Sequence, residues 1–350
     1  MSLMQRSSPH VMGRNTTSRI MLWVIVAALP GLLALSYFYG WGYLINTVIC
    51  VVSAVLAEAA ILMLRKRPVL KTLKDASAVL TGVLLGVTLP PFAPWWIMVI
   101  ASGFAMVFVK HLYGGLGQNL FNPAMAAFAL VLISFPLPMT TSWSTPEAIS
   151  NEPLPSFSQQ LSHNLEWQAY DGITMATPLD HYKTKIKRLT ADELAQTPEY
   201  VAGPFYGILW VNLAFLLGGL LLLFLKIISW HGPVGLFTGL LVLALPFSAD
   251  ADSAMPVLMH LFAGATVFGA FFIVTDPASS ATSNRGKFIF GFGVGILTYC
   301  IRTWGNFPDA IAFAVLLMNI SAPFIDHYTR PRTYGKPKPV SGYKLPEESP

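Results

Sequence analysis

Residues 42–64 read GYLINTVICVVSAVLAEAAILML, an apolar run with a single charged residue, Glu58. A helix needs about 20 apolar residues to cross a bilayer. In the whole chain, 54% of residues are hydrophobic and only 11% are charged, whereas soluble domains carry about 25% charged residues. A lipid-facing surface explains this deficit. The runs are solidly apolar, so they do not fit the alternating strands of a β-barrel. The sequence predicts an all-α polytopic integral membrane protein.

About ten transmembrane helices are expected from runs of this kind. Three of them, the third, fifth and seventh, are short and interrupted by Pro or Gly. Such broken helices are tolerated only where protein or a cavity covers the loose backbone. The expected spans lie near residues 20–38, 42–64, 77–92, 95–112, 122–138, 205–227, 233–248, 256–275, 288–304 and 308–325.

Lys and Arg residues set the expected orientation, because cytoplasmic loops carry an excess of them. With an even number of spans both termini share one side, and that side holds most of the basic residues, including Arg65-Lys66-Arg67. That side is therefore expected to be cytoplasmic. The chain then divides into a first membrane half (1–138), an outward-facing loop (139–204), a second membrane half (205–327) and a cytoplasmic tail (328–350).

The two halves contain a weak internal repeat. Residues 122–130 align with residues 307–315, and Pro, Ala, Phe and Ala recur at matching positions. Five spans separate the two segments, so they are expected to run in opposite directions. Two five-helix inverted repeats, with a site near the midplane where broken helices meet, would show this pattern. Chance similarity between two Ala- and Phe-rich helices is the alternative.

Net charge and cysteine content exclude several other classes of protein. The formal net charge is +5, but the basic residues flank membrane spans, so no nucleic-acid partner is expected. Cys50 and Cys300 both lie inside apolar runs, and the chain has no Cys-x-x-Cys or Cys/His cluster. We expect no metal site, no iron–sulfur cluster and no structural disulfide within this chain.

The only long polar segment contains the motif with the clearest chemistry, Asp171-Gly172-Ile173-Thr174-Met175-Ala176-Thr177. The pattern Asp171, Thr174, Ala176, Thr177 resembles the acceptor sequence for covalent flavin attachment, in which the phosphate of FMN is joined to the hydroxyl of the last Thr. A segment modified by an external transferase must be exposed before assembly, which fits a loop. An ordinary loop threonine is the alternative interpretation of Thr177.

Aromatic residues near this motif offer stacking partners for a flavin ring. Trp167, Tyr170 and Tyr182 flank the attachment motif along the chain. Stacking against one of them, at the membrane surface, is expected to hold the isoalloxazine ring.

Further motifs make the chain resemble a known family, over nearly its whole length. It is similar to the D subunits of Rnf-type (Rsx) ion-translocating electron transport complexes and to their relatives, the B subunits of the sodium-pumping NADH:quinone reductase. Usually a Gly precedes the Ala-Thr of the attachment motif, where this chain has Met175. The segments that carry the resemblance are residues 17–21, 73–78, 90–96, 112–125, 171–180, 271–277 and 328–332.

The resemblance implies a redox role inside a bacterial inner-membrane complex, as a translocase-class oxidoreductase subunit that is not active alone. FMN on Thr177 would relay electrons between NADH- or ferredoxin-linked subunits, coupled to transport of H⁺ or Na⁺. The implied partners are other flavin and iron–sulfur subunits, a flavin transferase during maturation, and the lipid bilayer.

A glycine-rich segment before the fifth span is a candidate for a second, non-covalent flavin such as riboflavin. Gly114 and Gly115 allow a close backbone approach to a ligand, and Asn119 and Asn122 lie just before a helix start with free N–H groups. Arg285, in the loop that corresponds to it in the second half, is a further candidate contact. A tight turn that only packs helices, and a basic topology anchor, are the alternatives.

Ionisable residues within spans are costly in a bilayer and often functional. Glu58 is the deepest, and we expect it to be the best candidate for a proton or cation pathway. Lys110, Arg302 and Asp309 lie near span ends, where long or terminal side chains snorkel to the interface.

Two other functions remain open from the sequence. An inverted repeat with broken helices also suits a small-solute channel or transporter without a redox cofactor, although the small number of buried charges argues against an ion path within this chain alone. A scaffold that only anchors other subunits is the third possibility, and the motif around Thr177 argues against it.

Overall fold

The computed structural model describes most of the two predicted membrane halves and short pieces of the segment between them, residues 139–204. The predictions for Asp171, Thr174, Ala176, Trp167, Tyr170 and Asp309 lie outside the described residues. The described residues are 16–144, 146, 153–166, 177–185, 193, 207–247, 255–305 and 310–331.

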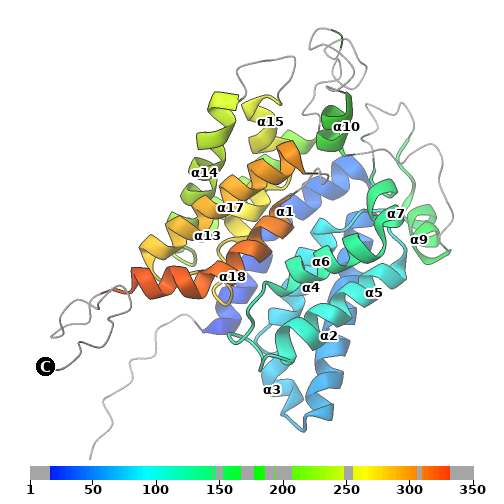
Figure 1. Cartoon of the computed structure of the whole chain (residues 1–350). Coiled ribbons are helices and arrows are strands. Elements are labelled where there is room, and N and C mark those ends of the chain that lie inside the picture. Colours follow the sequence, from blue (N-terminus) through cyan, green and yellow to red (C-terminus); the bar gives the residue numbers. More distant parts are fainter. Residues whose placement is uncertain are drawn as a thin grey trace, which may run out of the picture.

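Every element in the described part of the chain is a helix, which confirms the predicted all-α class (Figure 1). Figure 1 shows the first half, in blue to blue-green, beside the second half, in yellow-green to red. The first half contains α1 (Thr17–Tyr39), α2 (Gly42–Leu64), α3 (Val69–Leu73), α4 (Ser77–Thr88), α5 (Trp95–Phe104), the π-helix η1 (Ala105–His111), α6 (Pro123–Ser134) and α7 (Pro136–Thr141). The segment between the two halves contributes α9 (Phe157–Glu166) and α10 (Pro178–Lys185). The second half contains α13 (Ile208–Phe224), α14 (His231–Phe247), α15 (Val257–Phe262), α16 (Thr266–Phe268), the π-helix η2 (Gly269–Ile273), α17 (Asn284–Trp304) and α18 (Ile311–Thr329).

Three of the described helices are long and apolar enough to cross a bilayer: α1, α2 and α18. Shorter apolar helices occupy Ser77–Thr88, Trp95–His111, Pro123–Ser134, Ile208–Phe224 and His231–Phe247. The multi-pass membrane architecture is thus confirmed by length and composition, while the count of about ten crossings stays a prediction.

The third span ends at a proline pair, as its sequence predicts, and side chains from elsewhere satisfy the exposed carbonyls. Asn46 of α2 donates its amide N–H to the Pro90 carbonyl at 2.8 Å. Asn164 and Gln160, both on α9, donate to the Pro91 carbonyl at 3.1 and 3.2 Å. These polar groups are buried, and together they dock α9 onto the break. This connection between α4 and α5 is stable because its carbonyls find partners inside the protein.

The seventh expected span is continuous, so the predicted interruption there is wrong. α14 runs unbroken from His231 to Phe247, and its glycines serve close packing, since a Cβ on Gly239 would lie 2.2 Å from the Phe292 carbonyl oxygen of α17. The second half is broken instead in the eighth span, between α15 and α16. A Gly or Pro in an apolar run can either interrupt the helix or allow a neighbouring helix to pack closely. The sequence alone does not distinguish these two roles.

The break in the eighth span is also covered by side chains from other helices. Asn212 of α13 donates to the Phe262 carbonyl at 2.7 Å, and Arg302 of α17 donates to the His260 carbonyl at 2.7 Å. Arg302 is 1% exposed, so its predicted snorkelling to the interface is wrong. Its guanidinium instead supplies the hydrogen bond that the interrupted helix lacks.

The two halves meet along pairs of helices that occupy corresponding places in each half. α1 packs along α13, and α6 packs against α18. Small residues allow the first contact to be close, because a Cβ on Gly218 would lie 1.9 Å from the Ala27 carbonyl oxygen. Contacts between corresponding helices are those expected around the axis of an inverted repeat.

Gly218→Ala is expected to destabilise the protein, because the added methyl group collides with backbone rather than with a movable side chain. Overpacking of this kind costs about 1–3 kcal/mol, which outweighs the roughly 1 kcal/mol that Ala gains over Gly in a helix. Thermal unfolding in detergent measures the effect. The matched control is Gly103→Ala on α5, where a Cβ would meet nothing within 4 Å. Equal melting temperatures for the two variants would contradict the close contact between α1 and α13.

Candidate functional site

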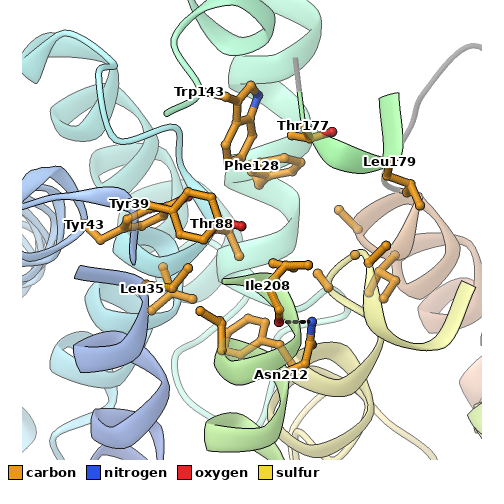
Figure 2. Close-up of a pocket in the computed structure, with 18 of the residues that line it drawn as sticks. Leu35, Tyr39, Tyr43, Thr88, Phe128, Trp143, Thr177, Leu179, Ile208 and Asn212 are labelled. Atoms are coloured by element: carbon orange, nitrogen blue, oxygen red, sulfur yellow. Dashed lines mark hydrogen bonds between the residues drawn. The ribbon is translucent and has the colours of Figure 1, made fainter. Parts of the chain in front are cut away.

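A cavity of about 320 Å³ lies between the two halves, at the end of the bundle where α1 ends and α13 begins (Figure 2). Its size falls within the range of about 300–1,000 Å³ that is usual for small-molecule sites. Thr177 is one of its lining residues. The wall is mostly apolar and contains several aromatic side chains, namely Tyr39, Tyr43, Phe128, Trp143, Phe215 and Phe268.

Thr177 is held at this cavity by the helix that follows it. Pro178 is the first residue of α10, and a Thr before a Pro at the first helical position favours a helix start. Leu179 and Tyr182 of α10 are buried against Met259 and Ala263 of the broken eighth span. Because α10 packs on the second half, the residue before it lies at the mouth of the space between the halves.

A hydrogen bond at the far end of α10 strengthens this docking. Lys183 donates to the Gly305 carbonyl, which follows the end of α17, at 2.5 Å. The position of Thr177 therefore depends on contacts with two separate helices of the second half.

The predicted stacking partner Tyr182 is placed elsewhere by the structure. Its side chain is 4% exposed and packs with Leu179 against α15, and it is not among the residues that line the cavity. The aromatic side chains that do line it come largely from α1, α2, α6 and α13, far away in the sequence. No local pattern around the attachment motif indicates them.

Most polar groups in the cavity wall that have a described partner bond to backbone close by. Thr88 donates to the Leu85 carbonyl at 3.0 Å, Trp143 to the Met139 carbonyl at 3.0 Å, and Asn212 to the Ile208 carbonyl at 3.0 Å. The buried hydroxyl of Tyr39 differs from them, because it has no hydrogen-bond partner among the described residues. The cavity thus combines an apolar interior with one lining residue, Tyr39, whose buried hydroxyl has no partner among the described residues.

Glu58 lies in a second, separate site near the opposite end of the first half, where it is buried together with Lys110 and His111. Lys110 Nζ contacts Glu58 Oε1 at 2.5 Å, and His111 Nε2 contacts the same oxygen at 2.9 Å. Lys110 also donates to Ser77 Oγ at 2.6 Å, and Ser77 Oγ donates to Asp75 Oδ1 at 2.5 Å. Lys110 is 2% exposed, so its predicted snorkelling is wrong. The second carboxylate oxygen of Glu58 has no partner among the described residues.

The two consecutive residues that reach the Glu58 carboxylate lie in the π-helix η1. In an α-helix neighbouring side chains diverge by about 100°, and the wider turn of a π-helix changes that spacing, often at functional sites. Lys110 and His111 are the last two residues of η1. The sequence places Glu58 and Lys110 in spans but does not pair them, because the pairing depends on how α2 and η1 pack.

The glycine-rich segment forms a tight turn whose asparagines bond within the chain. Gly114, Gly115 and Gly117 have φ angles of 125°, 113° and 84°, a region that favours glycine. Asn119 accepts a hydrogen bond from the Gly117 amide at 3.3 Å. Asn122 is the N-cap of α6 and accepts from the amides of the next turn at 3.0 and 3.2 Å.

The structure also brings this segment close to the loop before α17. With the amide of Asn319 oriented to satisfy its neighbours, its oxygen accepts from the Asn122 amide at 3.0 Å and its nitrogen donates to the Ser279 carbonyl at 3.1 Å. Arg285 is exposed. The second flavin site stays a prediction, with the two loops adjacent and the two asparagine side chains bonded to backbone.

Comparisons with known proteins agree with the family resemblance. A sequence model of the NQR2, RnfD, RnfE family matches residues 4–335. The D subunit of the ion-translocating oxidoreductase complex of Marinobacter nauticus is 53% identical over 344 residues, which are 98% of each chain. The protein of the same name from Ectopseudomonas mendocina is 52% identical over 99% of this chain and 100% of its own length. That from Yersinia enterocolitica is 48% identical over 94% and 97%.

Lys110→Met is expected to destabilise the protein strongly, because it leaves the Glu58 carboxylate buried without its cation. Removing one partner of a buried ion pair costs about 3–5 kcal/mol. The double variant Lys110→Met/Glu58→Gln is expected to recover most of the lost thermal stability, since no unpaired charge remains. A thermal-unfolding double-mutant cycle measures the coupling. Additive losses in the double variant would show that the two groups do not interact.

Proposed function

Because the chain belongs to the NQR2, RnfD, RnfE family, we propose that it is the membrane-embedded D subunit of an ion-translocating oxidoreductase complex. Relatives that are similar to this chain over nearly its full length carry that name. In this function it relays electrons through FMN joined by its phosphate to Thr177. The observation that carries the proposal is the position of Thr177, beside a mostly apolar cavity of ligand size between the two halves.

The residues around Thr177 fit a phosphate-linked flavin. A phosphate on the Thr177 hydroxyl would lie at the start of α10, and helix N-termini favour anions. The isoalloxazine ring would enter the cavity, where Phe128 and Trp143 offer apolar and aromatic surface. When bound, FMN supplies reversible electron transfer, and the protein holds the ring and keeps water from it.

The arrangement of helix ends supports an outward position for Thr177. The cavity is lined by Tyr39 at the end of α1 and Ile208 at the start of α13. The opposite end of α1 contacts the basic loop after α2, where Ser18 donates to the Lys74 carbonyl at 2.7 Å. With the basic loops cytoplasmic, both termini are cytoplasmic, the chain lies in a bacterial inner membrane, and a flavin transferase acts on the outer side.

The proposed function needs other subunits and does not operate in the isolated chain. NADH- or ferredoxin-linked flavin and iron–sulfur subunits would deliver and remove electrons, and the complex would couple their flow to H⁺ or Na⁺ transport. Within this chain, the Glu58 network is the candidate for a proton or cation step. A buried carboxylate with an unpartnered oxygen is costly, and such ionisable groups in a membrane protein mark functional sites.

The small-solute channel gains no support from the cavity. A conduit for polar solutes requires a polar lining, whereas this cavity is bordered mainly by Leu, Val, Ile, Met, Ala and aromatic side chains. A ring system with an apolar body and a polar edge fits such a lining better.

Thr177→Val is expected to abolish covalent flavin attachment, because the nucleophilic hydroxyl is lost while side-chain size is kept. The measurement is peptide mass spectrometry of the chain purified after co-expression with a flavin transferase. The matched control is Thr184→Val, on the exposed side of α10, which should carry the same added mass as the unchanged protein. An unmodified Thr177 peptide in the unchanged protein, with an active transferase, would overturn the proposal.

Ala312→Phe is expected to leave attachment intact but to expose the ring, because Ala312 lines the cavity and is 5% exposed. The added ring would occupy the space meant for the isoalloxazine. Iodide quenching of flavin fluorescence measures this exposure, with the unchanged protein as the protected reference. Equal quenching in both would show that the attached ring lies outside the cavity.

A further inference from the structure

Tyr39 is the last residue of α1, and its side chain borders the cavity beside Thr177. The residue is 5% exposed. Its hydroxyl is buried and has no hydrogen-bond partner among the described residues. A buried hydroxyl without a partner is destabilising, so its presence calls for an explanation, which a ligand in the cavity provides.

The Tyr39 ring is held in a defined orientation. It packs edge-to-face against Tyr43 with ring centroids 6.4 Å apart and an interplanar angle of 79°. Tyr43 is itself 5% exposed. Figure 2 shows Tyr39 beside Leu35 and Phe128 in the cavity, with Thr177 also at its edge. The Tyr39 ring at the cavity wall is therefore held by a rigid aromatic pair.

The chemistry of the isoalloxazine ring is complementary to this wall. One edge of the ring carries methyl groups, and the other carries carbonyl oxygens and ring nitrogens that accept hydrogen bonds. The part of the lining from the second half includes Ala263, Gly264, Ala265 and Phe268, which suit the methyl edge. The part of the wall that contains Tyr39, whose hydroxyl has no described partner, suits the edge of the ring that accepts hydrogen bonds.

We propose that the Tyr39 hydroxyl donates a hydrogen bond to an accepting atom on the polar edge of the flavin ring. This inference rests on the proposed function and adds a positioning residue to it. Electron uptake makes the accepting edge more negative, and a hydrogen bond to a more negative acceptor is stronger. The bond therefore favours the reduced ring, and Tyr39 raises the reduction potential of the flavin while orienting it.

Tyr39→Phe tests the proposal, because it removes the hydroxyl and keeps the packed ring. The protein is the full chain co-expressed with a flavin transferase, and the readouts are FMN mass on the Thr177 peptide, the visible absorption spectrum and the midpoint potential. Attachment is expected to persist, while the absorption bands shift and the potential becomes more negative. The matched control is Tyr37→Phe on the same helix, whose side chain is 79% exposed, and it should behave as the unchanged protein.

The same substitution in a flavin-free background separates this role from a purely structural one. In Thr177→Val, Tyr39→Phe is expected to leave the melting temperature equal or higher, because it removes an unpartnered hydroxyl. In the flavin-carrying protein it is expected to lower the melting temperature. An unchanged spectrum and potential with FMN present on Thr177 would overturn the role of Tyr39 and leave the proposed function intact. Absence of FMN from Thr177 in the unchanged protein would overturn both.

Discussion

A peptide group in the hydrocarbon core of a bilayer must find its hydrogen-bond partner within the protein, and the broken spans of this chain are arranged around that requirement. Asn46 satisfies the Pro90 carbonyl in the first half. Asn212 and Arg302 satisfy the Phe262 and His260 carbonyls in the second. These side chains fix α2 on the first break and α13 and α17 on the second. The hydrogen bonds of Asn46 and Asn212 thus help to position α2 and α13, which both line the cavity.

The cavity lies between the halves and is lined by residues at or next to both breaks. Thr88 ends α4 just before the first break, and Ala263 to Ala265 form the second. α10 packs on the second break through Leu179 and Tyr182, so Thr177, the proposed attachment residue, is positioned by the same irregular segment that forms one wall. The proposed cofactor site and the interruption of the membrane helices are thus one structural feature.

The Glu58 network shows how a charged group is kept inside the membrane part. Desolvating a carboxylate is costly unless a cation and hydrogen bonds compensate it. Lys110 and His111 both contact Glu58 Oε1, and Ser77 and Asp75 extend the network through Lys110. The π-helix delivers both partners to one oxygen. The other oxygen has no described partner, and this asymmetry makes the group a candidate for binding a proton or cation.

The sequence alone determined the helical membrane class, the break at Pro90-Pro91, the family and the candidate attachment residue, because apolar run length, proline and a contiguous motif are local properties. It did not reveal that the second half breaks between α15 and α16, that Lys110 and Arg302 are buried, or which aromatic residues line the cavity. Tyr39, Phe128 and Phe215 come from three separate helices. Only the tertiary structure brings them to Thr177, because such a cavity depends on the packing of surfaces distant in sequence, which no local pattern encodes.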